Sequence, residues 1–285
     1  MKKIVTLLLV LCIAGGIAAA QEGFSVGGDT AKDLRKNSNS LFAVPFASYE
    51  MAVSEFDIFG ELGLPLGFND INNNLWVSLD LSIKATYNLG ISPTGSMAIW
   101  LENWTHVPFK DSLMLPSSSP MNRPWSYTEN LEMYMGAGVN YTHNLSFGDV
   151  YGTLVMPFIL LGDNNTDPFD FAMLNLTLGM GTSIGVGGGL TLFNYINKNK
   201  NSDDKSNFFN DVDVFVSYTT GPLSARVTVN IPIENEIKDA GINIIPEAQY
   251  NLDSGITVFG AVPIQGIGRD YDPTVGFKIG GKLGF

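Results

Sequence analysis

Cysteine, histidine and charge are all scarce in this chain. It has one cysteine, two histidines and 15% charged residues, whereas typical soluble domains carry about 25% charged residues. The single cysteine, Cys12, lies in the N-terminal apolar stretch, so we expect no disulfide framework and no thiolate chemistry in the mature protein. The net charge of −12 argues against nucleic acid as a partner. Beyond the N-terminus, no apolar run reaches the length of a spanning helix, although 45% of the residues are hydrophobic.

The N-terminus has the three parts of a secretory signal peptide. Two lysines precede an apolar stretch, Ile4–Leu11, and small residues follow as far as Ala18–Ala20. We therefore expect residues 1–20 to be cleaved and residues 21–285 to form one mature domain. Two alternatives stay open. The uncharged stretch could be a transmembrane anchor at the lower limit of spanning length, or Cys12 could belong to a lipoprotein signal.

The last residues of the chain, Thr274–Phe285, alternate in character. Apolar residues and one glycine occupy the odd positions, whereas threonine, glycine and lysine occupy the even ones. Because side chains alternate between the two faces of a strand, this segment is predicted to be an amphipathic strand. It resembles the terminal strand of bacterial outer-membrane β-barrels, which commonly end in phenylalanine. The resemblance implies recognition by the barrel-insertion machinery, with Phe277 and Phe285 as the insertion signal.

An amphipathic hairpin recurs along the chain. Segments such as Leu75–Leu89 and Leu223–Ile233 alternate apolar and polar residues, and their strands have about the 9–11 residues that a tilted strand needs to cross a membrane. Several hairpins carry a tyrosine on the apolar face near the short turn, which predicts an aromatic girdle at the lipid headgroups. The girdle residues are Tyr87, Tyr141, Tyr218 and Tyr250. Apolar-Pro-apolar triplets recur in the second strands, and because proline cannot donate to a ladder we expect them at the outer rim. The hairpin that turns near Thr182 lacks both marks.

The hairpins predict the number of strands. Six hairpins and the final strand make thirteen strands, whereas single-chain bacterial barrels have even numbers. Glu22–Asp29 is the expected first strand, which would pair with the last strand and close the sheet, and Thr30–Ser40 would be the first outer loop. We predict an all-β fold, a transmembrane antiparallel up-and-down barrel of fourteen strands, with twelve as the alternative. The short turns are expected near Ala52, Ser92, Ser146, Thr182, Gly221 and Asp253.

Few residues point to catalysis or metal binding. We expect His106 near the outer rim and His143 beside a short turn, so the two histidines would not share a site. Asp163–Asp167 has oxygen ligands at alternate positions, but it lacks the glycine and the closing glutamate of a Ca²⁺ loop. We therefore expect no enzyme activity, no metal site and no cofactor.

The polar faces of the strands are the expected functional surface. An Arg or Lys facing lipid costs roughly 2–4 kcal/mol at the membrane midplane, and a polar lumen removes that cost. The residues that alternation assigns to the lumen are Glu55, Asp57, Glu61, Asp80, Lys84, Glu102, Glu132, Asp211, Asp213, Arg226, Glu247, Lys278 and Lys282. The excess of carboxylates over cations in this set favours cations weakly.

The length and hairpin layout of the chain resemble those of monomeric porins of about fourteen strands. The resemblance implies a cell outer-membrane location, in contact with outer-membrane lipid, and a channel for passive diffusion of ions and small polar solutes. The alternative is a non-conducting surface or structural barrel whose outer loops bind a host or envelope partner.

Overall fold

The structure is a computed structural model. It describes residues 23–33, 40–69, 74–110, 113–114, 126–127, 132–161, 171–197, 211–233, 241–252, 255–268 and 273–284. Every regular element in these ranges is a β-strand. None of the described residues belongs to a helix that is long and apolar enough to span a membrane. The expected signal peptide, residues 1–20, lies outside the described residues.

Eighteen strand segments follow one another along the chain. They are β1 (Phe24–Asp33), β2 (Ser40–Val53), β3 (Phe56–Gly63), β4 (Leu66–Asn69), β5 (Asn74–Ser92), β6 (Gly95–Lys110), β7 (Leu113–Met114), β8 (Ser126–Tyr127), β9 (Glu132–Leu145), β10 (Gly148–Leu161), β11 (Phe171–Thr182), β12 (Val186–Asn197), β13 (Asp211–Thr220), β14 (Leu223–Pro232), β15 (Ile242–Asn251), β16 (Ile256–Ala261), β17 (Ile264–Ile267) and β18 (Thr274–Gly284). The short segments β7 and β8 pair only with each other, and the other sixteen form one sheet.

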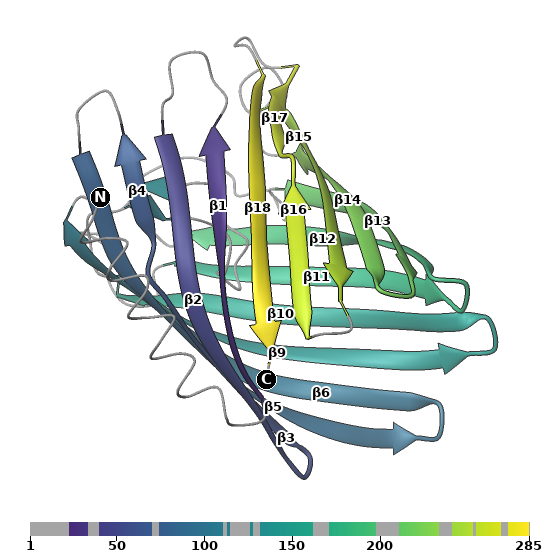
Figure 1. Cartoon of the computed structure of the whole chain (residues 1–285). Coiled ribbons are helices and arrows are strands. Elements are labelled where there is room, and N and C mark those ends of the chain that lie inside the picture. The colour runs from purple at the N-terminus through teal and green to yellow at the C-terminus, as the bar shows by residue number, and fades with distance from the viewer. Residues whose placement is uncertain are drawn as a thin grey trace.

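The large sheet closes into an antiparallel barrel (Figure 1). Strand β1 pairs with β2 on one side and with β18 on the other, so the first and last strands seal the wall. The segments β3 and β4 both lie between β2 and β5, and β16 and β17 both lie between β15 and β18, so each pair is one interrupted strand. The barrel therefore has fourteen strands, as predicted, and the twelve-strand alternative is wrong. Closure gives backbone groups partners on both sides of each strand, which lipid could not provide.

The first strand is longer than the sequence predicts. We expected it to end at Asp29, but β1 continues to Asp33 and pairs with β18 from Ser25↔Gly284 to Asp33↔Gly276. Residues 30–33, expected in the first outer loop, are thus part of the wall. Strands β2 and β18 both run alongside this segment. Their backbone partners outweigh the weak strand preference of its side chains.

Two prolines interrupt strands inside the wall. The break between β3 and β4 falls at Pro65, the break between β16 and β17 falls at Pro263, and pairing resumes beyond each. The residue before each of these prolines, Leu64 or Val262, donates its backbone N–H to the carbonyl of a proline on the neighbouring strand, Pro45 at 2.9 Å and Pro246 at 3.0 Å. Because proline has no N–H to donate, an irregular point in the ladder accommodates it. The prediction that these prolines mark the outer rim is therefore wrong.

Short turns join the strands at one end of the barrel. They lie near the predicted positions, except that the first is centred on Ser54–Glu55 instead of Ala52. In the turn between β11 and β12, Gly185 has a φ of 86°, and a side chain there would lie 1.8 Å from the carbonyl oxygen of Thr219. The N–H of Thr219 donates to the carbonyl of Gly185 at 2.8 Å, so this glycine ties the turn to β13.

The strands near β5 are unusually long. Strands β5 and β6 have 19 and 16 residues, and β9 and β10 have 14 each. A tilted strand needs only about 9–11 residues to cross a membrane. This part of the wall is therefore longer than a membrane crossing requires.

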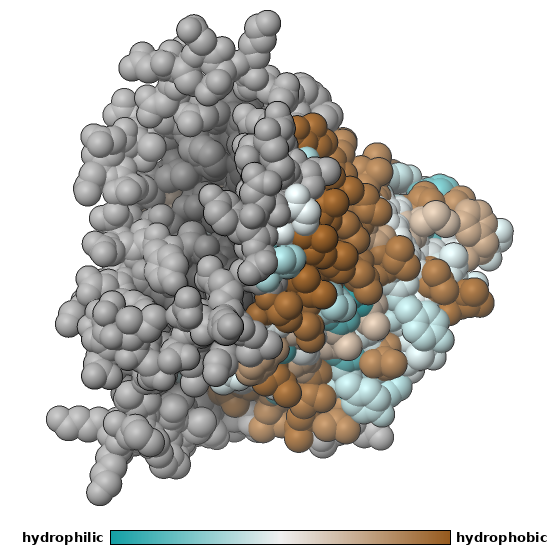
Figure 2. All heavy atoms as spheres, turned by 90° about the horizontal axis from the view of Figure 1, so that it is seen from above, coloured by the Kyte–Doolittle hydropathy of each residue, from teal (hydrophilic) through white to brown (hydrophobic). Residues whose placement is uncertain are grey.

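The outer surface of the barrel is apolar. Along β5, Leu81 and Ile83 are exposed, whereas the alternate residues Asp80 and Ser82 are buried. Figure 2 shows hydrophobic side chains over a broad area of the described surface. Monomeric soluble proteins rarely expose such an area. Apolar side chains thus face outward and polar ones inward, which is the arrangement of transmembrane barrels.

Candidate functional site: the inner face of the barrel

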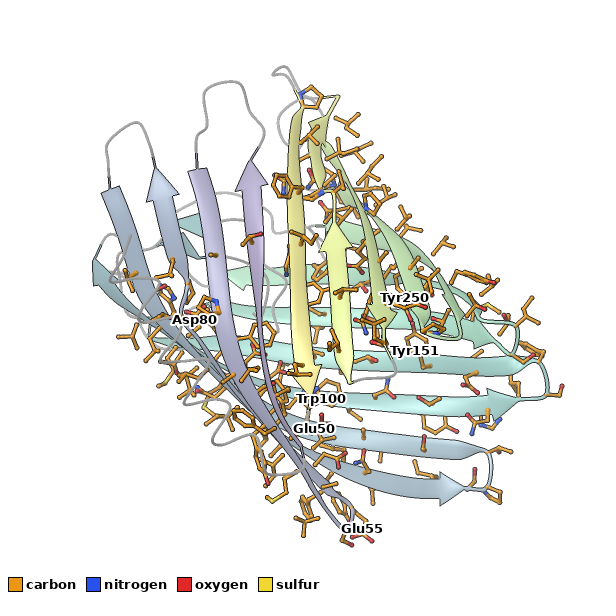
Figure 3. All side chains as sticks on the ribbon, viewed as in Figure 1. Glu50, Glu55, Asp80, Trp100, Tyr151 and Tyr250 are labelled. Atoms are coloured by element: carbon orange, nitrogen blue, oxygen red, sulfur yellow. The ribbon has the colours of Figure 1, made fainter. Side chains whose placement is uncertain are left out.

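The inner face carries most of the charged residues that alternation assigned to it. The predicted residues that lie there are Asp57 and Glu61 of β3, Asp80 and Lys84 of β5, Glu102 of β6, Asp213 of β13, Arg226 of β14, Glu247 of β15, and Lys278 and Lys282 of β18. The expectation for Glu55 is wrong, because this residue lies in the exposed turn between β2 and β3 (Figure 3). Glu132 and Asp211 have described backbones in β9 and β13, but their side chains lie outside the described part.

One stretch of the inner face is tightly packed. His106 of β6 is fully buried, and its Nδ1 lies 2.5 Å from Oδ1 of its register partner Asp80, which is 4% exposed. The His106 ring stacks on Trp104, with ring centroids 5.9 Å apart. Burying a carboxylate is costly unless it is paired. His106 supplies that partner, so the two residues join β5 and β6 inside the wall.

A pair of lysine and glutamate follows on the same two strands. Lys84 and Glu102 are register partners, and Glu102 is 8% exposed. The Lys84 ammonium lies 4.4 Å from the ring centroid of Trp100, a distance typical of a cation–π contact. This cluster and the Asp80–His106 pair place buried charged and aromatic side chains together on the β5–β6 wall.

Large inward aromatic rings lie over glycines of the next strand. A Cβ atom on each of these glycines would lie within 2.6 Å of a ring atom of the aromatic register partner, so the ring occupies the place of the missing side chain. The pairs are Phe46 over Gly27, Trp100 over Gly138, Tyr151 over Gly179 and Phe215 over Gly189. Sequence reasoning missed these aromatics because it followed charges. Their alternation with outward apolar residues was the available signal.

A row of polar side chains crosses seven neighbouring strands of the inner wall. Its members are successive register partners: Asn140, Thr153, Thr177, Thr191, Asp213, Asn230 and Asn243, on β9 to β15. Hydrogen bonds link several of them, with Asn140 Nδ2 donating to Thr153 at 2.6 Å and Asn230 Nδ2 donating to Asp213 at 2.7 Å. Cross-strand hydrogen bonds of this kind stabilise sheet pairing. They also keep this part of the lumen polar.

A cavity of about 530 Å³ lies within the barrel, between the walls β2–β3 and β13–β18. Four charged side chains line it: Glu61, Arg226, Glu247 and Lys278. Its aromatic lining comes from Phe46, Phe59 and Phe259, and its neutral polar lining includes Ser217, Thr219, Ser224 and Gln249. Thr219 and Ser224 flank the short turn between β13 and β14, so the cavity lies toward the end of the barrel that carries the short turns.

One charged pair in this cavity, Arg226 and Glu247, is separated more widely than the Asp80–His106 pair of the packed wall. Arg226 Nε lies 3.8 Å from Glu247 Oε1, beyond hydrogen-bond distance, and the two side chains are 40% and 48% exposed. The guanidinium lies 4.0 Å from the ring centroid of Phe215, and its Nε donates to Thr228 Oγ1 at 3.1 Å. Phe215 and Thr228 thus contact Arg226 in addition to its ion pair with Glu247.

The predicted girdle tyrosines lie near the short turns. Tyr141, Tyr218 and Tyr250 are exposed on the outer face, and Tyr87 is half-buried beside Phe56, with ring centroids 4.7 Å apart. Their role as a membrane girdle remains a prediction. The same holds for the predicted insertion signal. Its Phe277 is half-buried in β18, and its Phe285 lies outside the described residues.

The two histidines lie at opposite ends of the β6–β9 pair. His106 is the register partner of Glu132, whereas His143 is the partner of Gly95, next to the short turn. His143 Nδ1 lies 3.2 Å from the hydroxyl oxygen of Tyr141. Among the described residues, no group of three His, Cys, Asp or Glu side chains is placed to hold a metal ion. The segment Asp163–Asp167 lies outside them.

Comparisons with known proteins find similarity in structure only. No protein-family model matches the sequence, and no curated protein matches it. Among solved structures, CdiB from Acinetobacter baumannii matches 91% of this chain at 10% identity and a TM-score of 0.46. This chain spans 60% of the length of CdiB. OccK11 from Pseudomonas aeruginosa matches at 9% identity and a TM-score of 0.42, with 91% of this chain and 94% of OccK11 covered. A mutant of the Rh. blastica porin matches at 9% identity and a TM-score of 0.43, with 92% and 99% covered.

Proposed function

We propose that this protein is an outer-membrane channel for passive diffusion of ions and small polar solutes, with a weak preference for cations. The observation that carries the proposal is the inverted polarity of the closed barrel. Exposed apolar side chains such as Leu101 and Val216 cover the outside, whereas charged side chains such as Arg226 and Glu247 line a cavity inside. A closed barrel of this polarity suits lipid outside and water inside.

The outer-membrane location is supported by the residue patterns of the N-terminal segment and of the last strand. The N-terminus has the pattern of a cleaved export signal, and the last strand has the alternation that resembles a barrel-insertion signal. On this proposal, the partners of the protein are the outer-membrane lipid and the insertion machinery. The exposed tyrosines near the short turns would lie at the headgroup level.

The cation preference rests on the balance of inward charges. The described inner face carries the carboxylates of Asp57, Glu61, Asp80, Glu102, Asp213 and Glu247, and the cations of Lys84, Arg226, Lys278 and Lys282. An excess of carboxylates raises the local concentration of cations in a water-filled lumen. Because cations of the protein are interspersed, we expect a weak preference.

The packed wall favours a second candidate function. His106 and Trp104 are 0% and 2% exposed, so part of the described lumen is filled by side chains. A barrel filled throughout would not conduct, and it would act as a surface or structural protein whose outer loops bind a host or envelope partner. Most residues of those loops lie outside the described part of the chain.

Single-channel recording separates the two candidates. The mature chain, residues 21–285, would be refolded, checked for the heat-dependent gel shift of folded barrels, and added to a planar bilayer under a KCl gradient. Steady conductance steps with a reversal potential on the cation side would support the channel. A folded barrel that inserts but never conducts would refute it and leave the structural role.

A further inference from the structure

The cavity in the barrel differs from the chain as a whole in its charge balance. The whole chain has a net charge of −12, but the charged side chains that line the cavity are two carboxylates, Glu61 and Glu247, and two cations, Arg226 and Lys278. The lining is therefore close to neutral overall while containing both signs. Such a surface has little net attraction for a simple anion or a simple cation, and it favours a ligand that carries both charges.

Three of these charges lie at one level of the wall. Arg226, Glu247, Ala261 and Lys278 are successive register partners on β14, β15, β16 and β18. Neighbouring strands are about 4.8 Å apart, so the backbones of Arg226 and Lys278, three strands apart, are separated by about 14 Å along the wall. Glu247 lies between them, and the small side chain of Ala261 leaves space beside it. This spacing suits a ligand of several ångströms whose two charges are separated.

Arg226 is presented to the cavity in a fixed orientation. It lies over the Phe215 ring and donates through Nε to Thr228, and its 3.8 Å separation from Glu247 is too long for a direct hydrogen bond. The terminal nitrogens of a guanidinium form a fork that matches a carboxylate. Because Arg226 and Glu247 are both about half exposed, a ligand can approach each of them.

The facing wall supplies a carboxylate and aromatic surface. Glu61 and Phe59 come from β3 and Phe46 from β2, and they line the same cavity as Phe259. Aromatic faces attract ammonium groups and bury apolar side chains. An uncharged ligand would displace water from the charged lining without replacing the hydrogen bonds that the water made. The cavity volume of about 530 Å³ is within the range of small-molecule sites.

We propose that this cavity binds zwitterionic solutes, namely a free amino acid or a short peptide. The ligand carboxylate pairs with Arg226 or Lys278, its ammonium pairs with Glu247 or Glu61, and its side chain lies against the phenylalanines. A role of this site in binding solutes that pass through the barrel rests on the proposed channel function. Binding of a zwitterion in the cavity does not require that the barrel conducts ions.

The test compares three probes that share a benzyl group and differ in charge. They are phenylalanine, which is a zwitterion, phenylalaninamide, which is a cation at about pH 6.5, and 3-phenylpropanoate, which is an anion. Binding to the refolded mature barrel in detergent is measured by titration calorimetry. We expect phenylalanine to bind about tenfold more tightly than either analogue, since it gains one further charge-assisted contact.

Variants assign each ligand charge to its partner. Arg226→Gln should reduce the advantage of phenylalanine over phenylalaninamide, whereas Arg226→Lys should reduce it less because the charge remains. Glu247→Gln should instead reduce the advantage over 3-phenylpropanoate. Glu55→Gln, in the exposed turn, is the matched control and should change none of the three affinities.

Either of two results would overturn the proposed site. One is a folded barrel that binds none of the probes, which would mean that the four charges satisfy one another. The other is binding of all three within about twofold, which would mean that the cavity recognises only the benzyl group. Conductance is recorded on the same preparation. Selective phenylalanine binding without conduction would refute the channel and support the site. Conduction without selective binding would support the channel and refute the site.

Discussion

The indole ring of Trp100 occupies the space in which Gly138, its register partner on β9, would carry a side chain. A Cβ atom on Gly138 would lie 2.2 Å from two carbon atoms of that ring. Phe46, Tyr151 and Phe215 have the same relation to glycines of their neighbouring strands. The absence of a side chain at these glycines thus lets large rings lie against the inner wall.

Gly138→Ala should destabilise the barrel because the added methyl group forces Trp100 out of its place. Overpacking of this kind costs about 1–3 kcal/mol. The measurement is the free energy of unfolding in urea, followed by tryptophan fluorescence in lipid vesicles. Gly181→Ala is the control, since a Cβ at this inward glycine meets nothing within 4 Å. Equal stability of the two variants would contradict the packing of Trp100 on Gly138.

Removal of either partner of the Asp80–His106 pair should also destabilise the fold. Each single variant, Asp80→Asn or His106→Asn, leaves a buried polar group without its partner, which costs about 1–3 kcal/mol. The double variant should cost less than the sum of the two, with a coupling energy of about 0.5–3 kcal/mol. Asp149→Asn changes an exposed aspartate and should be nearly neutral. Additive single effects would show that the pair does not stabilise the barrel.

Neutralising the cavity carboxylates should weaken the cation preference of the channel. A unit charge about 8 Å from an ion in water contributes about 0.5 kcal/mol, so Glu61→Gln and Glu247→Gln should each lower the cation-to-anion permeability ratio about twofold. Arg226→Gln should raise it by a similar factor. The ratio is obtained from the reversal potential under a KCl gradient at neutral pH. An increase for either glutamate variant would contradict the proposed position of the ion path.

The control for that series is Glu55→Gln, which should leave the permeability ratio unchanged. Glu55 lies in the exposed turn between β2 and β3. A hydrogen bond from Ser54, together with a backbone hydrogen bond, lowers the pKa of Glu55, so this carboxylate is ionised at the pH of the measurement. A change as large as that of Glu247→Gln would show that the effect is a general one of net charge.

Two adjacent residues of β13 test which face meets lipid. Val216 is 61% exposed on the outer face, whereas Ser217 lines the cavity on the inner face. Val216→Lys should destabilise the barrel in lipid vesicles by up to about 2–4 kcal/mol, the range for a lysine facing the midplane, with less toward the interface. Ser217→Lys should cost much less because the new charge can reach water in the cavity. The measurement is the unfolding free energy of each variant in vesicles, and a reversed order would mean that the faces are inverted.

Much of the fold was predictable because the pattern that determines it is local. Alternation of polar and apolar residues, tyrosines near short turns and an even number of strands together predict the fourteen-stranded barrel. Local patterns failed where neighbouring strands decide the outcome. Residues 30–33 read as a loop, yet they join the wall because β2 and β18 both pair with them. Pro65 and Pro263 read as rim residues, yet each strand resumes beyond its proline.

By itself, the sequence determined which side of each strand is polar, because alternation along a strand requires no knowledge of its neighbours. It therefore assigned Glu61, Arg226, Glu247 and Lys278 to the inside. Only the tertiary structure decided which of them meet. Register between strands sets whether a carboxylate lies within hydrogen-bond distance of a histidine, as Asp80 does, or 3.8 Å from a guanidinium, as Glu247 does. Register depends on pairing between residues far apart in the chain, and so closure of the barrel was needed to bring four charges and three phenylalanines around one cavity.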